Sequence, residues 1–158
     1  AMRPAHRANV PRVTYDLDCH FVGMQVGEWV AEIRLIVDNK GMARRSFRSI
    51  RVKLRVIMRG CDLTSLKGGP RLNFPKKLID IDLIDEEKEE YYYVEPGVRQ
   101  VFSLPVKLPG DATFVLLHAR FRTRFEGEAE LTGEAAEDDQ FDEERVFAAP
   151  SSPDLVRP

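Results

Sequence analysis

Apolar and polar residues alternate with a period of two along most of this chain. That period places apolar side chains on one face of an extended strand and polar side chains on the other. Helical periodicity is scarce, and residues typical of turns separate the alternating segments. These segments cover residues 13–21, 29–37, 50–58, 79–85, 102–106 and 113–125. The sequence therefore predicts an all-β fold.

Clusters of Asn, Asp, Pro and Gly predict where the chain reverses direction. They lie at residues 38–41, 95–97 and 109–111. A further short strand is expected at 145–149, because Val146 and Phe147 form an apolar segment in an otherwise polar region. The tyrosines at 91–93 are expected on a core-facing or edge strand. About seven strands in this order favour an antiparallel β-sandwich.

Two segments carry features of edge strands. Asp80, Asp82 and Asp85 alternate with apolar residues, and such charge discourages pairing with another chain. Pro105 interrupts segment 102–106, and proline is found on edge strands or at bulges because it lacks an N–H group. The alternative interpretation of Asp80 and Asp82 is an acid–base pair, in which proximity of two carboxylates raises one pKa.

One domain accounts for most of the 158 residues. We expect a flexible N-terminus at 1–11, a single β-sandwich domain at 12–149 with an acidic loop at 126–144, and a disordered tail at 150–158. No apolar run reaches about 18 residues, so no membrane contact is expected. The N-terminal residues do not resemble a secretion signal, which predicts a cytoplasmic protein. Its two cysteines, Cys19 and Cys61, are expected to be free thiols.

Residues suited to catalysis or metal binding are few and scattered. His6, His20 and His118 share no metal-ligand spacing, although Asp18 and His20 fall on one face of a predicted strand. The sequence motifs of nucleophilic hydrolases, P-loops and dinucleotide sites are absent. We therefore expect no enzymatic activity, no cofactor and no bound metal.

Two strand segments are bounded by glycine turns: residues 29–41 (WVAEIRLIVDNKG) and residues 94–109 (VEPGVRQVFSLPVKLP). The first resembles the second strand of bacterial immunoglobulin-like domains of the cell-adhesion-related and fibronectin-like kind. The second resembles the segment of those domains in which Pro-Gly precedes a strand. The resemblance spans roughly residues 13–125 and implies an immunoglobulin-like antiparallel β-sandwich of about seven strands. It implies a fold and not an activity.

Arg44 and Arg48 have the spacing of the Arg-x-x-x-Arg motif in PilZ domains, which bind cyclic di-GMP. Guanidinium groups can stack on guanine and pair with phosphate. The second PilZ motif is matched only in part, because Asp62 precedes Ser65 by three residues where the motif has two. This resemblance implies a cyclic-dinucleotide site as an alternative function.

Charges of one sign are concentrated in the third predicted strand and the turn before it. No acid lies between Asp38 and Asp62, a region that holds eight cations. These are Lys40, Arg44, Arg45, Arg48, Arg51, Lys53, Arg55 and Arg59. In this topology the third and sixth strands are neighbours, which places Arg51, Lys53 and Arg55 beside Arg120, Arg122 and Arg124. Like charges across strands are destabilising, so this face requires a counterion, a partner or an internal cover.

Ten acids and no base lie between residues 126 and 144. One interpretation is that this loop and the last strand lie against the sixth strand and neutralise it. The other is a displaceable lid over a binding site for an acidic protein or nucleic acid.

These patterns predict a non-catalytic protein–protein interaction or accessory module that uses a basic sheet face covered by an acidic segment. The expected partner-binding residues are Arg44, Arg45, Arg48, Arg51, Lys53, Arg55, Arg120, Arg122 and Arg124. Another protein is the expected partner, and a nucleic acid or cyclic dinucleotide is the alternative. The oligomeric state is left open.

Overall fold

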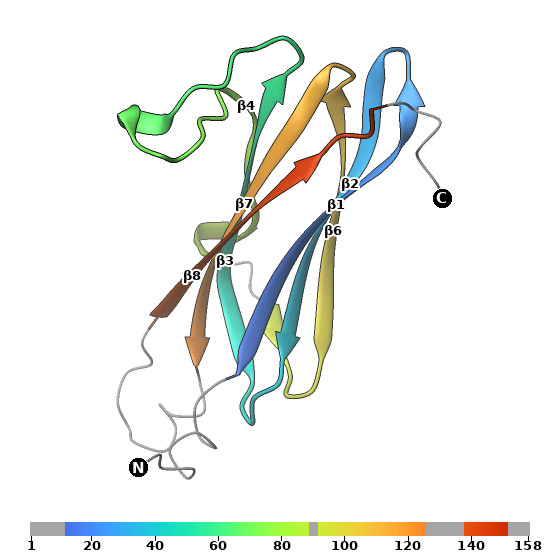
Figure 1. Cartoon of the computed structure of the whole chain (residues 1–158). Coiled ribbons are helices and arrows are strands. Elements are labelled where there is room, and N and C mark those ends of the chain that lie inside the picture. Colours follow the sequence, from blue (N-terminus) through green and yellow to red (C-terminus); the bar gives the residue numbers. More distant parts are fainter. Residues whose placement is uncertain (1–11, 89–91, 126–137, 152–158) are drawn as a thin grey trace.

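Strands dominate the computed structural model, which describes residues 12–88, 92–125 and 138–151. Within these residues, eight strands form two antiparallel sheets that pack face to face (Figure 1). The predicted all-β sandwich is therefore confirmed. Two short 3-10 helices, η1 (Leu66–Gly68) and η2 (Glu86–Lys88), lie before and after β4. None of the helices in the described part of the chain is long and apolar enough to cross a membrane.

The smaller sheet, sheet A, has the strand order β1-β2-β6. Its strands are β1 (Val13–Gln25), β2 (Glu28–Asn39) and β6 (Arg99–Pro109). The larger sheet, sheet B, has the order β4-β3-β7-β8, and β5 pairs with the beginning of β3. Its strands are β3 (Arg45–Met58), β4 (Lys76–Asp85), β5 (Tyr92–Val94), β7 (Ala112–Phe125) and β8 (Asp138–Ala148). The predicted edge positions of β4 and β6 are confirmed.

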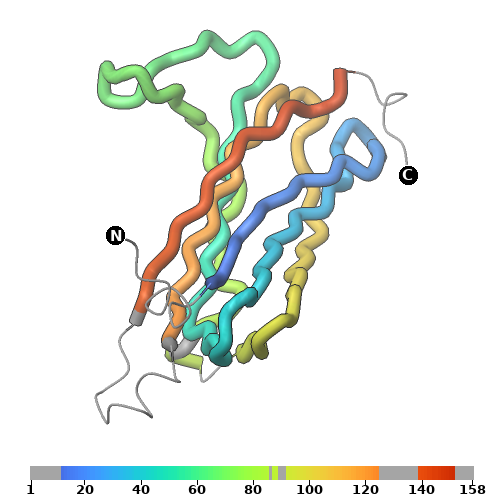
Figure 2. The backbone as a smooth tube through the Cα atoms, turned by 60° about the horizontal axis from the view of Figure 1, so that its bottom comes forward, coloured from blue at the N-terminus to red at the C-terminus, as the bar shows by residue number. Residues whose placement is uncertain are grey.

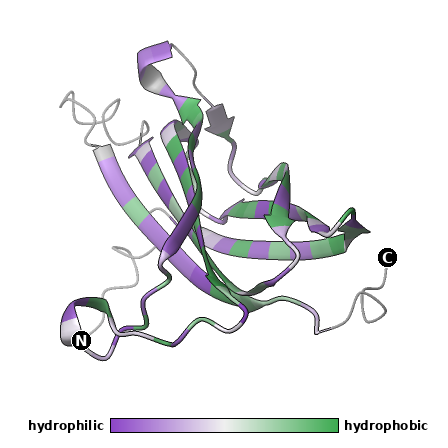
Figure 3. Cartoon of the chain, turned by 90° about the horizontal axis from the view of Figure 1, so that it is seen from above, coloured by the Kyte–Doolittle hydropathy of each residue, from purple (hydrophilic) through white to green (hydrophobic). Residues whose placement is uncertain are grey.

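The core lies between the two sheets and consists of the apolar residues that alternate in the sequence. Figure 3 shows this alternation as hydrophobic and hydrophilic bands along the strands. Leu17 and Leu35 from sheet A and Ile50 and Phe121 from sheet B are fully buried. Each such side chain contributes roughly 1.5–3 kcal/mol through its removal from water. The inward faces predicted for these strands are therefore confirmed.

Aromatic contacts close both long sides of the sandwich. On one side β1 lies next to β8, as Figure 2 shows, and the ring of Tyr15 stacks on Phe141 with centroids 4.4 Å apart. Arg145 of β8 also donates to the carbonyl oxygen of Leu17, at 3.1 Å. On the other side Tyr92 of β5 meets Phe102 of β6 edge to face, with centroids 5.1 Å apart. The sheets are thus joined at their margins as well as through the core.

Two turns meet at one end of the sandwich. Gly110, between β6 and β7, lies so close to the β1–β2 turn that a Cβ atom there would be 2.2 Å from the carbonyl oxygen of Gly27. The same Cβ would be 2.7 Å from Cε of Met24. Only a glycine allows this approach. In the β1–β2 turn itself, Val26 has a φ of 49° and its side chain is 94% exposed.

At the opposite end, the buried amide of Asn39 joins the predicted turn at 38–41 to strand β5. Its Nδ2 donates to the carbonyl oxygens of Ala43 and Val94, at 3.0 and 2.9 Å. Its Oδ1 accepts from the backbone N–H of Gly41 at 3.0 Å. The turn residue is therefore also a buried connection between sheets A and B.

Two predicted boundaries are wrong. The last strand begins at Asp138 and not at 145, so residues 138–144 of the expected acidic loop belong to β8. The acids extend in a strand because β7 offers basic partners across the sheet. The strand expected for the tyrosines at 91–93 is confirmed for Tyr92 and Tyr93, which belong to β5. The expected flexible start (1–11), the rest of the acidic loop (126–137) and tail residues 152–158 lie outside the described residues.

Candidate functional site

The predicted neighbours β3 and β7 pair at the centre of sheet B, and this adjacency is confirmed. Their register sets Arg51 opposite Arg120 and Lys53 opposite His118. The side chains between them, such as Val52 and Ala119, are fully buried in the core. Because strand side chains alternate between faces, the basic residues point to the outer face of the sheet.

The strands on either side of this pair add acids to the same outer face. One row runs Asp82, Arg51, Arg120, Asp142 from β4 to β8, and the next runs Asp80, Lys53, His118, Glu144. Each row thus has an acid at both ends and basic groups in the middle. We call the eight residues of these rows, together with Arg55 and Arg122, the charged face. They are Asp80, Asp82, Arg51, Lys53, Arg55, His118, Arg120, Arg122, Asp142 and Glu144.

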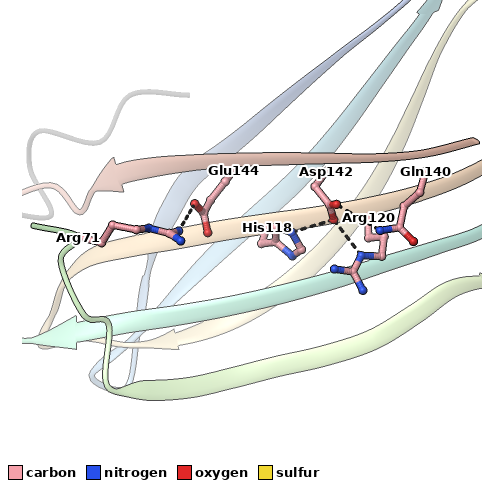
Figure 4. Close-up of polar contacts among 6 residues, drawn as sticks. All are labelled: Arg71, His118, Arg120, Gln140, Asp142 and Glu144. Carbon is pink, nitrogen blue, oxygen red and sulfur yellow. Dashed lines mark hydrogen bonds and ion pairs between the residues drawn. The ribbon is translucent and has the colours of Figure 1, made fainter. Parts of the chain in front are cut away.

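On the β8 side, Asp142 receives most of the contacts (Figure 4). Its Oδ1 accepts from Nε of Arg120 at 2.9 Å and lies 3.1 Å from Nε2 of His118. Its Oδ2 accepts from Nε2 of Gln140 at 3.4 Å. Burial acts to raise the pKa of Asp142, but the hydrogen bond and charge of Arg120, with Gln140 and His118, outweigh it. The pKa of Asp142 therefore lies below its ordinary value.

On the β4 side, Asp80 plays the corresponding role. Nε of Arg51 donates to its Oδ1 at 2.7 Å, and Nζ of Lys77 donates to its Oδ2 at 3.2 Å. The hydrogen bond from Arg51, supported by Lys77, holds the pKa of Asp80 far below its ordinary value. The alternative in which Asp80 and Asp82 form an acid–base pair with a raised pKa is therefore wrong for Asp80.

Arg55 holds the loop between β3 and β4 against the sheet. Its Nε donates to the carbonyl oxygen of Phe74 at 2.7 Å, and its Nη2 donates to that of Pro75 at 3.4 Å. From the same loop, Nη2 of Arg71 donates to Oε2 of Glu144 at 3.3 Å (Figure 4). The loop is thus attached to the sheet at β3 and at β8.

Arg45, expected among the partner-binding residues, lies elsewhere. A β-bulge between Phe47 and Ser49 reverses the alternation of β3, so that Arg45 and Phe47 face inward. The guanidinium of Arg45 pairs with Asp139 at 3.3 Å and only 7% of the residue is exposed. It lines a cavity of about 190 Å³ together with Tyr15, whose pKa burial raises to about 12. Arg45 is therefore part of the join between β1 and β8.

Arg44 is placed at the β5 end of sheet B. Its guanidinium lies 4.5 Å from the centroid of the Tyr93 ring and 3.7 Å from the carboxylate of Glu95. Tyr93 is opposite Ser46, which is opposite Arg124 in β7. The predicted residues Arg44 and Arg124 therefore lie beyond the charged face at one end, where Ser46 of β3 separates Tyr93 from Arg124.

The two PilZ motif segments are not brought together. Arg44 lies just before β3, whereas Asp62–Gly68 follows its other end, and a strand of 14 residues spans about 45 Å. A single cyclic dinucleotide cannot contact both ends of such a strand. The structure therefore removes the motif geometry on which this alternative depended.

The acidic segment flanks the basic face; in the described residues it does not cover it. Asp142 and Glu144 belong to the adjacent strand β8. They lie opposite Arg120 and His118 of β7 and share the outer face with them. The expected neutralisation of β7 is confirmed for Asp142, which contacts Arg120 and His118, and the expected cover is wrong for Asp142 and Glu144. Sequence reasoning missed these roles because it placed the last strand too late. The signal was present, since Phe141 and Phe147 share the parity of an inward strand face.

Other candidate sites give no constellation. Asp18 pairs with Arg34 at 4.0 Å, and within the described ranges no group of three His, Cys, Asp or Glu side chains could hold a metal ion. Cys19 and Cys61 are free thiols, as predicted. Burial raises the pKa of Cys19 to about 12, which keeps this thiol protonated and unreactive.

Comparisons with known proteins place the chain by fold. Neither a family model nor a curated protein matches it. It is similar to the crystal structure of a putative ApaA protein from Bordetella pertussis, with a TM-score of 0.55 and 11% identity over 90% of this chain and 97% of that one. It is also similar to the Northeast Structural Genomics Consortium target SoR45, with a TM-score of 0.51 and 8% identity over 92% of this chain and 90% of that one. At such identities the likeness concerns the fold alone.

Proposed function

We propose that this chain is a non-catalytic protein-binding module whose partner contacts the charged face of sheet B. The observation that carries this proposal is the direct opposition of Arg51 and Arg120 at the centre of the sheet. Their side chains are 46% and 43% exposed. Like charges at opposed positions destabilise a sheet, and a partner that supplies acids between them would relieve that repulsion.

The flanking acids favour a protein over a nucleic acid. A phosphate backbone laid across β3 and β7 would also meet Asp80 and Asp82 on one side and Asp142 and Glu144 on the other. Nucleic-acid affinity depends on continuous basic surface, because it derives from phosphate neutralisation. A protein can match an acid–base–base–acid row with charges of its own, which gives specificity as well as attraction.

Two further expectations are part of the proposal. The sandwich is taken to be of the immunoglobulin-like type, and segments 29–41 and 94–109 support this through their resemblance to such domains. The cytoplasm is taken as its location, which two free cysteines support, since thiols persist in reducing compartments.

Charge reversal at the centre of the face tests this function. The double variant Lys53→Glu/Arg122→Glu alters the two central strands and leaves the pairs Arg51–Asp80 and Arg120–Asp142 in place. The double variant Arg99→Glu/Lys107→Glu, on the outer side of β6, makes the same change in net charge and is the matched control. Both are immobilised beside the wild type and exposed to protein extract of the source organism.

We expect the first variant to retain at least one protein about ten-fold less than the wild type does, at about 0.15 M salt. The control should retain it unchanged, and thermal unfolding should show that both variants are folded. Equal retention by all three proteins contradicts the proposal. If the wild type retains nucleic acid, with a steep dependence on salt concentration, and the first variant does not, the partner is a nucleic acid and not a protein.

A further inference from the structure

The loop between β3 and β4 has an internal structure of its own. Ser65 and Leu72 form an isolated β-bridge, and the N–H of Leu66 donates to the carbonyl oxygen of Arg71 at 2.7 Å. The N–H of Asn73 donates to the carbonyl oxygen of Thr64 at 2.8 Å. Such a loop presents its side chains in a fixed arrangement, which is the usual property of loops that carry recognition.

Leucines of this loop are exposed although the loop is ordered. Leu63 is 66% exposed, Leu66 39% and Leu72 42%. Phe74, by contrast, is buried and holds the base of the loop, where its carbonyl oxygen accepts from Arg55. The loop therefore uses one apolar side chain for its own anchoring and leaves three outside.

The outer face of sheet B also has exposed apolar residues at the end where Arg71 of the loop contacts Glu144. Leu116 and Val146 are paired on the outer face, one row beyond His118 and Glu144, and Val146 is about half exposed. The contact of Arg71 with Glu144 brings the loop to this end of the sheet (Figure 4). We call this surface the apolar patch. It comprises Leu63, Leu66, Leu72, Phe114, Leu116 and Val146.

We propose that the apolar patch is the anchor site for an extended segment of the partner protein, a segment that carries apolar residues next to acidic residues. This inference rests on the proposed function, because it assigns the partner of the charged face. Exposed apolar residues grouped beside charged ones are typical of an interface, in which an apolar centre supplies affinity and polar groups set the register.

Charge complementarity selects the acidic part of the segment. The two central strands present only basic groups beyond the patch: first Lys53 with His118, then Arg51 with Arg120, and then Arg122. Successive rows are two residues apart along β7, which is about 7 Å. An extended segment anchored at Leu116 would therefore place acids about two, four and six residues away from its apolar residues, on the side toward Arg122.

The acids at the margins of the charged face disfavour an anionic membrane as its occupant. Asp82 and Asp142 end one row, and Asp80 and Glu144 end the next. A narrow acidic segment can lie between these margins, whereas a broad anionic surface would meet them.

Selection from random peptides tests the inference. A displayed library of peptides of about twelve residues, long enough to span the face when extended, is selected on the full chain. The patch variant is Leu66→Ser/Leu72→Ser, and the matched control is Val22→Ser/Val30→Ser, which alters two exposed valines on sheet A. The face variant Lys53→Glu/Arg122→Glu is selected in parallel, and the unfolding temperature of each variant is recorded.

We expect enriched peptides in which one to three apolar residues lie at one end and Asp or Glu occur at the stated spacing from them. A synthetic copy should bind the patch variant about ten-fold more weakly than the wild type, since two leucine contacts are lost. The valine control should bind as the wild type does. Enrichment of acidic peptides that lose affinity for the face variant but not for the patch variant overturns the anchor and leaves the proposed function standing.

Absence of enriched peptides, or enrichment of basic ones, overturns both the anchor and the acidic partner. The wild type and the patch variant are also sedimented with vesicles of phosphatidylcholine and phosphatidylserine at a ratio of about 7:3. If the wild type binds the vesicles and the patch variant does not, the patch is a membrane site and the inference is overturned.

Discussion

The outer faces of the two sheets distribute their charges differently. On sheet A, Arg34 of β2 pairs with Asp18 of β1 and with Glu32 of its own strand, and Asp38 lies opposite Arg99 of β6. Every one of these cations has an acid on an adjacent position. On sheet B, Arg51 and Arg120 lie opposite each other, and their acids are supplied by the outer strands.

This difference shows which outer face has its charges balanced between directly opposed residues. On sheet A, Arg34 and Arg99 each lie opposite an acid of the neighbouring strand, so a partner would gain little by adding charges beside them. Sheet B keeps two basic strands side by side and depends on β4 and β8 to offset them. A face that keeps an internal repulsion gains more from a complementary partner, which is why sheet B is the better candidate for binding.

The largest effect on stability is expected where the β6–β7 turn, which connects the two sheets, packs against the β1–β2 turn. Loosening this contact would disturb the arrangement of both sheets and therefore of their outer faces. Gly110→Ala introduces a Cβ 2.2 Å from the carbonyl oxygen of Gly27, so the turns must move apart. We expect the free energy of unfolding to fall by about 2–3 kcal/mol in urea denaturation. Gly69→Ala is the control, since its Cβ would make an ordinary contact at 3.6 Å. Equal losses for both glycines would show that the turns are not in contact.

A smaller effect on stability is expected when a single acid is removed from the outer face of either sheet. Asp142→Ala leaves both Arg120 and His118 without their carboxylate, whereas Asp18→Ala leaves Arg34 with Glu32. We expect a loss of about 1 kcal/mol for Asp142→Ala and close to none for Asp18→Ala, measured by urea denaturation. A larger loss at Asp18 would reverse the comparison between the sheets.

The weak point of sheet A is its turn. Val26 has a φ of 49°, a conformation that costs a β-branched residue about 1 kcal/mol, and its side chain is almost wholly exposed. Asn tolerates this conformation and is preferred in such two-residue turns. Val26→Asn should therefore raise the free energy of unfolding by about 0.5–1 kcal/mol. Val30→Asn, at an exposed strand position, should not, and a gain there would contradict the backbone explanation.

The sequence was sufficient for most of the sandwich because its strands alternate strongly. The faces of residues 13–21 and 113–125 followed from parity alone, and the adjacency of β3 and β7 followed from the expected topology. Arg45 was misplaced because the bulge after Phe47 reverses parity, and a bulge leaves no mark in a pattern of residue types.

The charged rows were not predictable for a related reason. They depend on the register of β8 against β7, which sets Asp142 opposite Arg120. A strand in which five of the first seven residues are acids has low intrinsic β-propensity, so the sequence indicated a loop. Cross-strand pairing with basic residues outweighs that propensity, and such pairing becomes visible only once the neighbouring strand is known.

The smallest effect concerns the pH dependence of the acids that offset sheet B. The pKa values of Asp80 and Asp142 lie below their ordinary values in the folded chain. A depressed folded pKa adds stability that is fully present above the unfolded pKa, near 4, and is lost as the pH falls through the folded pKa. The stability of the wild type should therefore decline as the pH drops below about 4.5.

Replacement of one acid isolates its share of this decline. Asp142→Asn keeps the shape of the side chain but removes its charge, so its contribution is missing at neutral pH and nothing remains to be lost in acid. Unfolding by urea between about pH 7 and pH 2.5 should give two stability curves that converge as the pH falls, with the gap at neutral pH below about 1 kcal/mol, as expected for an exposed ion pair. Parallel curves would mean that the charge of Asp142 does not stabilise the fold. Only the acids of β4 would then offset the positive charge of the central arginines, and the β4 and β8 margins of the charged face would not be equivalent.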